Sequence, residues 1–304
     1  MDAGEQRYFS RTIDISRVDK VFFPDAGITK GDLIEYHVRI AEVMLGHLRD
    51  RPVAVKRYPD GLDGQGFFQK NAGSHYPDWI RRQRIPKRDG GSLDHVIVDE
   101  PATLVYLADQ GTIELHPWLS LADDLEHPVE LVLDLDPPDD EDVAAVRQAA
   151  RQLRDLLEEL EVGNRIKTSG SAGFHVHVPL DGSASWDVVA DLAKRIATTV
   201  SQRHPDTLTT SQRKAGRTGR VFVDWLRNSY GQTSVAAYSV RARPGAPVAT
   251  PIDWDELGST QPRSYDLRNI LRRLGQRDDP WQDAPAPVAA DDVAARLEAI
   301  GERG

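Results

Sequence analysis

The sequence contains no cysteine, which excludes disulfide bonds and thiolate metal sites, and nothing in it points to secretion. No apolar run approaches the roughly 20 residues that a membrane-spanning helix needs. The N-terminal "MDAGEQRYFS" also lacks the apolar core of a signal peptide. We therefore expect a cytoplasmic protein with no membrane partner. Any metal ion would be held by Asp, Glu or His, which favours hard cations such as Mg²⁺ or Mn²⁺.

Positive charge is in short supply, since 38 Lys and Arg against 48 Asp and Glu give a formal net charge of −10. This balance argues against a protein that binds polyanions over its whole surface. It does not exclude nucleic-acid binding, because binding depends on local patches. Acidic residues concentrate in 121–142, 155–161 and 278–302, whereas 7–88 and 203–243 contain basic clusters.

The first third of the chain predicts a helix followed by a hairpin. Apolar residues recur at helical spacing after Thr29, which is a suitable N-cap. The stretch "RPVAVKRYPDG" predicts a strand that ends in a turn, "LDGQG" a loop, and "FFQK" the second strand of the same hairpin. Residues 92–118 mix short strand-like and helical patterns.

The middle of the chain predicts the order β-α-β-β-α-β. The elements are a strand at 131–136, a helix from Asp142 to Leu160 ended by Gly163, two short strands within "RIKTSGSAGFHVHVPL", a helix from Ser185 to Arg203 with Val188, Leu192, Ile196 and Val200 inward, and a strand at 220–225. This is the ferredoxin-like or RRM-like plan of an α+β protein, with four strands in one antiparallel sheet. The tail predicts a helix near 264–274, a Pro/Ala linker at 280–289 and a short acidic helix at 290–301.

Two acids share one face of a buried strand in "LVLDLDPPDD". With a side-chain period of two, Asp134 and Asp136 lie on the same face about 6–7 Å apart. Asp224, in "VFVDW", falls on a strand of the same predicted sheet and is the third candidate ligand. Such carboxylates suit a pair of divalent cations. The alternative is that each Asp caps a turn at a strand end.

Three further segments suggest phosphate or nucleic-acid contacts. The "TSGSAGF" turn before His175 could present backbone N–H groups to a phosphate, or could be a plain tight hairpin; His177 fits a sheet histidine. Phe67 and Phe68, beside basic residues, suit stacking on bases, or they belong to a hairpin tip that a neighbouring loop covers. The run "QRKAGRTGRVFVDWLRN" is either solvated surface or a polyphosphate clamp; its basic residues are Arg213, Lys214, Arg217, Arg220 and Arg227.

In combination these motifs resemble the archaeo-eukaryotic primase-type polymerases. The resemblance is carried by the D-x-D of "DLDP", the "SGSAGFH" turn and the Asp of "VFVDW". The segments "VDKVFFPDAGITKGDL", "KRYPDGLDGQGFFQK" and "AAYSVRAR" are similar to the polymerase domain of bacterial ligase D, the non-homologous end-joining enzyme. The resemblance covers about residues 10–275.

The resemblance implies a single primase-polymerase domain over 1–304. It would comprise an N-terminal α/β DNA-end-binding subdomain at about 1–120, an RRM-like catalytic core at about 121–275 and an acidic tail at 276–304. No ligase or phosphoesterase domain is present, so we expect a stand-alone polymerase or one excised from a larger enzyme. The implied activity is templated addition of nucleotides, preferably ribonucleotides, to primer 3′ ends at breaks or gaps with a 5′-phosphate. The implied partners are Ku and a DNA ligase at the nucleoid, and the implied cofactor is a pair of Mn²⁺ or Mg²⁺ ions.

The resemblance also assigns roles to individual positions. The metals would be held by Asp134, Asp136 and Asp224. The nucleotide would be gripped by Ser169, His175, Arg217 and Arg241, with Lys56 and His116 near its sugar or the primer end. Lys20 and Lys30 would read the 5′-phosphate, and Phe67 and Phe68 would stack on the template strand.

One position departs from the family. The turn usually carries Lys or Arg where this chain has Ala172, so we expect weaker triphosphate binding, with Arg227 joining Arg217 and Arg241 in the phosphate grip. Two other functions stay open at this stage. One is a metal-dependent phosphoesterase or nuclease that uses the same carboxylates, and the other is a non-catalytic DNA-end-binding subunit.

Overall fold

The computed structural model describes residues 2–301, which fold into two compact units. The first unit comprises residues up to Trp118 together with Val235–Thr250 and Tyr265–Asp278, and the second comprises Leu119–Ser234, Pro251–Ser264 and the segment from Asp279 onward. Each unit is therefore assembled from separate stretches of sequence. Within residues 2–301 no helix is both long and apolar enough to cross a membrane.

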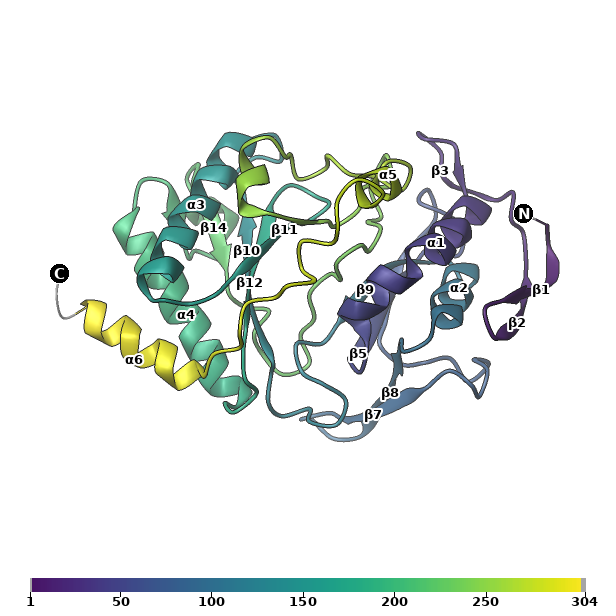
Figure 1. Cartoon of the computed structure of the whole chain (residues 1–304), viewed down its shortest axis with the longest axis horizontal. Coiled ribbons are helices and arrows are strands. Elements are labelled where there is room, and N and C mark those ends of the chain that lie inside the picture. Colours follow the sequence, from purple (N-terminus) through teal and green to yellow (C-terminus); the bar gives the residue numbers. More distant parts are fainter. Residues whose placement is uncertain (1, 302–304) are drawn as a thin grey trace. The chain divides into compact units, whose positions relative to one another are not determined.

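The first unit is built on a five-stranded antiparallel sheet with helices α1 and α2 packed together (Figure 1). The sheet runs β6 (Phe67–Gln69), β5 (Pro52–Arg57), β8 (Ser92–Ile97) and β7 (Arg82–Pro86), and β9 (Thr112–Pro117) also pairs with β5. The remaining elements are β1 (Gly4–Tyr8), β2 (Arg11–Ile15), β3 (Val21–Phe23), β4 (Ile28–Thr29), α1 (Lys30–Leu48), α2 (Pro101–Asp109) and α5 (Ile270–Leu274).

Helix α1 starts where the sequence predicts. The Thr29 side chain accepts from the amide of Asp32, and the Asp32 carboxylate accepts from the amide of Thr29, which forms a capping box. The helix predicted at 264–274 begins later, at Ile270. The Asp266 carboxylate accepts from the amides of Arg268 and Asn269, and this local turn competes with helix formation before Ile270.

The second unit contains the predicted ferredoxin-like sheet. Its four central strands lie in the order β14 (Val221–Asp224), β10 (Glu130–Asp136), β12 (Phe174–Pro179) and β11 (Arg165–Thr168), all antiparallel. One edge gains a parallel strand, β13 (Leu208–Thr209), and the other an antiparallel strand, β15 (Pro251–Ile252). Two 3₁₀ helices, η1 (Lys214–Gly216) and η2 (Trp254–Gly258), complete the loops. The predicted α+β fold class is confirmed.

Helices α3 (Val143–Glu159) and α4 (Trp186–Arg203) pack against this sheet (Figure 1). Helix α3 is capped by Asp142 as expected, but it ends before Gly163, because Glu161 already adopts a left-handed conformation with φ of 53°. Leu192, Ile196 and Val200 of α4 are buried as predicted, but Val188 is not. Val188 is 38% exposed, and Trp186 and Val189 are buried instead.

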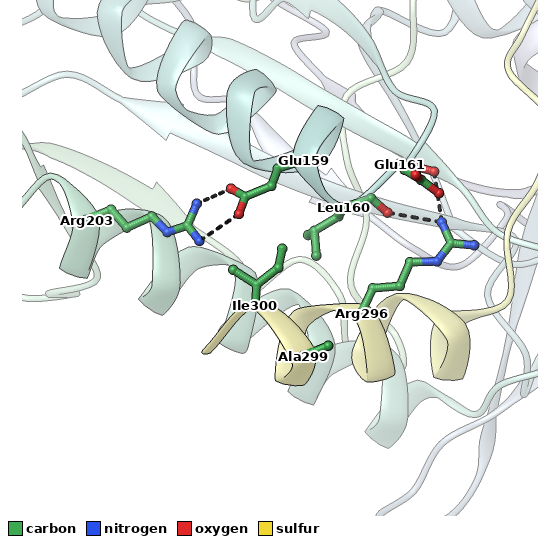
Figure 2. A pocket seen from close by; sticks show the side chains of 7 residues that line it. All are labelled: Glu159, Leu160, Glu161, Arg203, Arg296, Ala299 and Ile300. Atoms are coloured by element: carbon green, nitrogen blue, oxygen red, sulfur yellow. Dashed lines mark hydrogen bonds and ion pairs between the residues drawn. The ribbon is translucent and has the colours of Figure 1, made fainter. Parts of the chain in front are cut away.

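The C-terminal segment packs onto the second unit. Trp281 is buried, and its indole N–H donates to the carbonyl of Ile166 in β11. Helix α6 (Ala290–Gly301) packs on α4, and Arg296 donates to the carbonyls of Leu160 and Glu161 at the end of α3 (Figure 2). A pocket of about 460 Å³ opens between these helices, and no residue predicted for the functional site lines it.

Candidate functional site

The second unit carries a row of four polar side chains across four neighbouring strands. Lys167 of β11 pairs with His175 of β12, His175 with Asp134 of β10, and Asp134 with Asp224 of β14. The Lys167 ammonium lies 3.1 Å from His175 Nδ1, and His175 Nε2 lies 3.3 Å from Asp134 Oδ1. Strand alternation puts these residues on one face, and Asp136 follows Asp134 on that face.

Electrostatic repulsion between the carboxylates shifts their pKa values. Burial and the neighbouring Asp134 and Asp224 raise the pKa of Asp136. Burial and Asp134 also raise the pKa of Asp224, against the hydrogen bond that it accepts from the amide of Leu226. For Asp134 burial acts in the same direction, but His175 outweighs it and lowers the pKa. A bound cation would therefore stabilise the charged forms of Asp136 and Asp224.

The three carboxylates are chemically suitable ligands for divalent cations, although they do not surround a single ion position in the structure. Among residues 2–301 no group of three or more acidic or histidine side chains is gathered closely enough to hold a metal. Asp134 and Asp224 are nevertheless register partners, and Asp136 repels both. Carboxylate oxygens are the ligands that hard cations prefer, and a dication would remove this repulsion.

The turn between β11 and β12 lies directly against β10. A side chain at Gly173 would collide with the carbonyl oxygen of Leu135, between the two acids, so only glycine fits there. The amides of Ser171 and Gly173 both donate to Ser169 Oγ. Those two N–H groups are therefore already used within the turn, and a phosphate contact by the turn stays a prediction. Ser234 Oγ lies 3.3 Å from His175 Nδ1, the same ring nitrogen that Lys167 approaches.

Two of the predicted clamp arginines act on the acids, and a third is structural. Arg217 and Arg227 both lower the pKa of Asp136, and the Arg217 guanidinium lies 4.3 Å from the ring centroid of Phe222. Arg220 instead donates to the carbonyls of Pro205, Gly216 and Arg217, which pins the loop before β14.

The first unit brings three predicted nucleotide-binding residues around Glu114. This buried carboxylate accepts from His116 Nε2 at 2.8 Å, lies 3.5 Å from Arg241 Nε and 3.9 Å from Lys56 Nζ, and also accepts from the amide of Ala242. Burial would raise the pKa of Glu114, but His116, Arg241 and the amide lower it well below its usual range. Glu114 is therefore an anion that holds three cationic or polar side chains together.

The two adjacent phenylalanines of β6 are both exposed, Phe67 at 44% and Phe68 at 49%. A neighbouring loop that covered the hairpin tip would have buried at least one of them, so no loop of this unit covers the tip among the described residues. The Phe68 ring lies 4.8 Å from the His116 ring, and the Arg57 guanidinium lies 5.6 Å from the Phe67 centroid. The pair forms an aromatic surface beside the Glu114 cluster.

Lys20 and Lys30 line one small pocket of about 120 Å³ in the first unit, together with Arg17 and Arg57. Lys30 is buried and pairs with Asp109 at 2.6 Å, whereas Lys20 pairs with the exposed Asp60 at 2.6 Å. Of the two lysines, Lys20 therefore has the more exposed ion pair, which an incoming anion could replace.

Sequence reasoning missed Lys167 and Glu114. Both are buried charged residues within largely buried strands, "RIKT" and "TIELHP". Each stands two residues from a position that was singled out, Ser169 and His116 respectively. A buried charge is costly unless it is paired, so an isolated Lys or Glu within a core strand was the available signal.

Comparison with known proteins relates most of the chain to one family. The model of the LigD primase-polymerase domain family matches residues 29–281. The multifunctional non-homologous end-joining protein LigD of Mycobacterium bovis is 36% identical over 297 residues, which are 94% of this chain and 38% of that protein. The LigD of Pseudomonas aeruginosa is 37% identical over 285 residues, 92% of this chain and 34% of that protein. The chain thus spans less than two fifths of the length of these relatives.

A solved structure agrees with the sequence relatives. The polymerase domain of Mycobacterium tuberculosis ligase D, in complex with DNA, matches with a TM-score of 0.83 and 34% identity. The match covers 90% of this chain and 99% of that one, so the similarity extends over both units.

Proposed function

Because the chain belongs to the LigD primase-polymerase domain family, a family of nucleotidyltransferases in end joining, we propose that it extends primer 3′ ends at DNA breaks and gaps under the direction of a template. The family assignment confirms the resemblance and the polymerase-type enzyme predicted from the sequence. One observation carries the finer proposal. Asp134 and Asp136 lie on β10 and Asp224 lies on the adjacent β14. Asp134 is the register partner of Asp224, and both repel Asp136.

We propose Asp134, Asp136 and Asp224 as ligands for two divalent ions, Mn²⁺ or Mg²⁺. Such ions activate the attacking 3′-hydroxyl and stabilise the departing pyrophosphate in phosphoryl transfer. The protein's part is to hold the three acids in register through β10 and β14 and to orient Asp134 through His175. No protein nucleophile is needed for this chemistry, which agrees with the composition of the site.

Each unit carries side chains that we propose as nucleotide contacts. In the second unit the proposed contacts are Ser169, His175, Arg217 and Arg227. His175, Arg217 and Arg227 lower the pKa of one or more of the acids, and Ser169 belongs to the turn that packs on β10. In the first unit the proposed contacts are Lys56, His116 and Arg241, gathered by Glu114. DNA would be contacted by Phe67 and Phe68 through base stacking and by Lys20 and Lys30 through the 5′-phosphate. The solved relative was in complex with DNA, which supports this part of the proposal.

Substrate preference and partners form the outer part of the proposal. The relatives are end-joining proteins, and this chain covers only their polymerase part. We accordingly propose a preference for ribonucleotides, cooperation with Ku and a DNA ligase, and a place at the nucleoid in the cytoplasm.

Primer extension on a gapped, 5′-phosphorylated duplex with Mn²⁺ and labelled ribonucleotides tests the proposal. Templated extension supports it. Release of phosphate or cutting of DNA without a nucleoside triphosphate would instead identify a phosphoesterase or nuclease. Binding of the duplex without either reaction would identify an end-binding subunit.

A further inference from the structure

The turn that packs on the acids has no cation of its own. Between Lys167, buried in β11, and His175 the chain reads Thr-Ser-Gly-Ser-Ala-Gly-Phe, and the amides of Ser171 and Gly173 are used by Ser169. Any polyanion held at the acids lies beside this turn, because Gly173 rests on the carbonyl of Leu135. A polyanion needs charge-assisted donors at such a place, and the turn itself does not supply them.

An arginine from a distant part of the chain meets this turn. Arg263 Nε donates to the carbonyl of Ser171 at 2.8 Å, and its Nη2 lies 3.3 Å from Asp140 Oδ2, in the loop that follows β10. Arg263 therefore bridges the two loops that flank the acids, one after β10 and one before β12.

The segment that delivers Arg263 is held in place. Strand β15 pairs with β11, and the buried Thr260 accepts two hydrogen bonds through its carbonyl from the Arg147 guanidinium of α3. Arg263 follows three residues later, and Ser264 and Gln261 exchange hydrogen bonds around it. Its position on the turn is thus set by the fold of the second unit.

The Arg263 guanidinium keeps donors for a ligand. Its side chain is 44% exposed, and the partners that the structure gives it within residues 2–301 engage Nε and one N–H of Nη2. A guanidinium has five N–H donors, so the other three are available. Arg217 and Arg227 lower the pKa of Asp136, whereas Arg263 is held at Ser171 and Asp140, in the loops beside the acids.

We propose that Arg263 binds the terminal phosphates of the incoming nucleoside triphosphate, and that it supplies at this turn the cation that Ala172 does not. The inference rests on the proposed polymerase function. In a two-metal transfer the α-phosphate lies at the acids and the β- and γ-phosphates extend away from them. Arg217 and Arg227 then bind the α-phosphate near the acids, and Arg263 binds the β- and γ-phosphates.

Binding of ATP and of AMP in the presence of Mn²⁺, measured by calorimetry, tests the assignment directly. Arg263→Gln should weaken ATP binding about tenfold, the effect of one lost charge-assisted contact of roughly 1.4 kcal/mol. It should change AMP binding less than about twofold, because AMP lacks the terminal phosphates. Arg195→Gln, which removes an arginine of α4 that pairs with Asp191 and Glu298, is the matched control and should leave both affinities unchanged.

Two more variants separate phosphate binding from a purely structural bridge. Asp140→Asn breaks the same ion pair as Arg263→Gln, so a structural bridge predicts the same loss of ATP affinity in both. Phosphate binding predicts the loss in Arg263→Gln alone. Ala172→Lys, placed in the Arg263→Gln background, should restore most of the ATP affinity and the KM for nucleotide in extension.

The outcomes also distinguish this inference from the proposed function. Wild-type protein that neither binds ATP nor extends a primer overturns both. Wild-type protein that binds and extends, while Arg263→Gln keeps full ATP affinity, overturns the role of Arg263 alone. Equal losses in Arg263→Gln and Asp140→Asn, without rescue by Ala172→Lys, would also overturn it.

Discussion

Lys167 and His175 face each other across β11 and β12, with the Lys167 ammonium 3.1 Å from His175 Nδ1 inside the sheet. An ammonium has donors and no acceptor, so Nδ1 accepts and the ring proton belongs to Nε2. Nε2 is the atom that lies 3.3 Å from Asp134 Oδ1. Lys167 therefore sets the tautomer through which His175 orients the first carboxylate, although it is itself fully buried.

Lys167→Met should slow primer extension about tenfold or more, because His175 loses the partner that fixes its tautomer and about 1.4 kcal/mol corresponds to a factor of ten. The ¹⁵N shifts of His175 should change from a single Nε2-protonated form to a mixture. In the His175→Ala background the same substitution should cost little, since the effect passes through the histidine. Lys194→Met, on α4, is the matched control. Additive losses in the double variant would contradict the relationship.

Asp134→Ala and Asp136→Ala should each lower extension by at least about a hundredfold, because each ion supplies several kcal/mol of charge stabilisation. Binding to the gapped duplex should stay nearly intact, which gel shift can measure. Without added metal, Asp136→Asn should raise the Tm, since it removes a carboxylate that Asp134 and Asp224 repel. Extension within tenfold of wild type in both alanine variants would refute the ligand assignment.

Lys20→Ala should reduce the preference for a 5′-phosphorylated gap, since a charge-assisted bond to phosphate contributes about 1.5–3 kcal/mol. Competition binding with phosphorylated and unphosphorylated duplexes measures this. Adding Lys30→Ala should remove the rest of the preference but also lower the Tm, because Asp109 then lies buried without its cation. A wild-type protein that binds both duplexes equally would rule out the end-recognition role.

Glu114→Gln should raise the KM for nucleotide several-fold with a smaller change in kcat. His116, Arg241 and Lys56 all converge on this carboxylate, and a neutral amide holds them less firmly. The pattern of a raised KM is expected because these contacts exist before and during transfer. Glu100→Gln, which breaks the partly exposed pair with Arg11 in the same unit, should leave both constants unchanged.

Stability should fall in mild acid because of His37. This histidine is buried in α1, and burial lowers its pKa to about 4, against about 6.5 when unfolded. A depressed pKa gives stability that is complete above pH 6.5 and is lost as the pH falls towards 4, by up to roughly 3 kcal/mol. Urea unfolding at pH 7.5 and pH 4.5 measures the change. His37→Gln should make this dependence smaller, and an identical dependence would exclude His37 as the cause.

The elements with strong local signals were predictable from the sequence. The D-x-D strand, the two crossover helices and the Thr29 cap follow from period and capping chemistry. The β-α-β-β-α-β succession predicted the antiparallel sheet that the structure shows as β14-β10-β12-β11. Contacts between residues that are far apart in the sequence could not be predicted from it. Arg263 reaches Ser171 from the far side of η2, and Arg241 reaches Glu114 from a segment that returns to the first unit.

The boundary of the catalytic core illustrates the same limit. Residues 235–250 and 265–278 group with the first unit, and the segment from 279 onward with the second, whereas the resemblance implied a core at about 121–275 followed by a tail. A Pro/Ala-rich, acidic stretch is typical of a linker. Trp281 within it is buried, and a single aromatic is weak grounds for predicting from sequence that such a stretch packs.

Trp281 connects the C-terminal segment to the strand that carries Lys167. Its indole holds the carbonyl of Ile166, the Arg165 guanidinium lies 4.2 Å from its centroid, and the next residue along β11 is Lys167. A change at position 281 therefore acts within one or two peptide units of the row that orients Asp134. Substitutions there should be tolerated about as poorly as those at the site itself, and a shortened chain that loses Trp281 would show a defect in turnover as well as in folding.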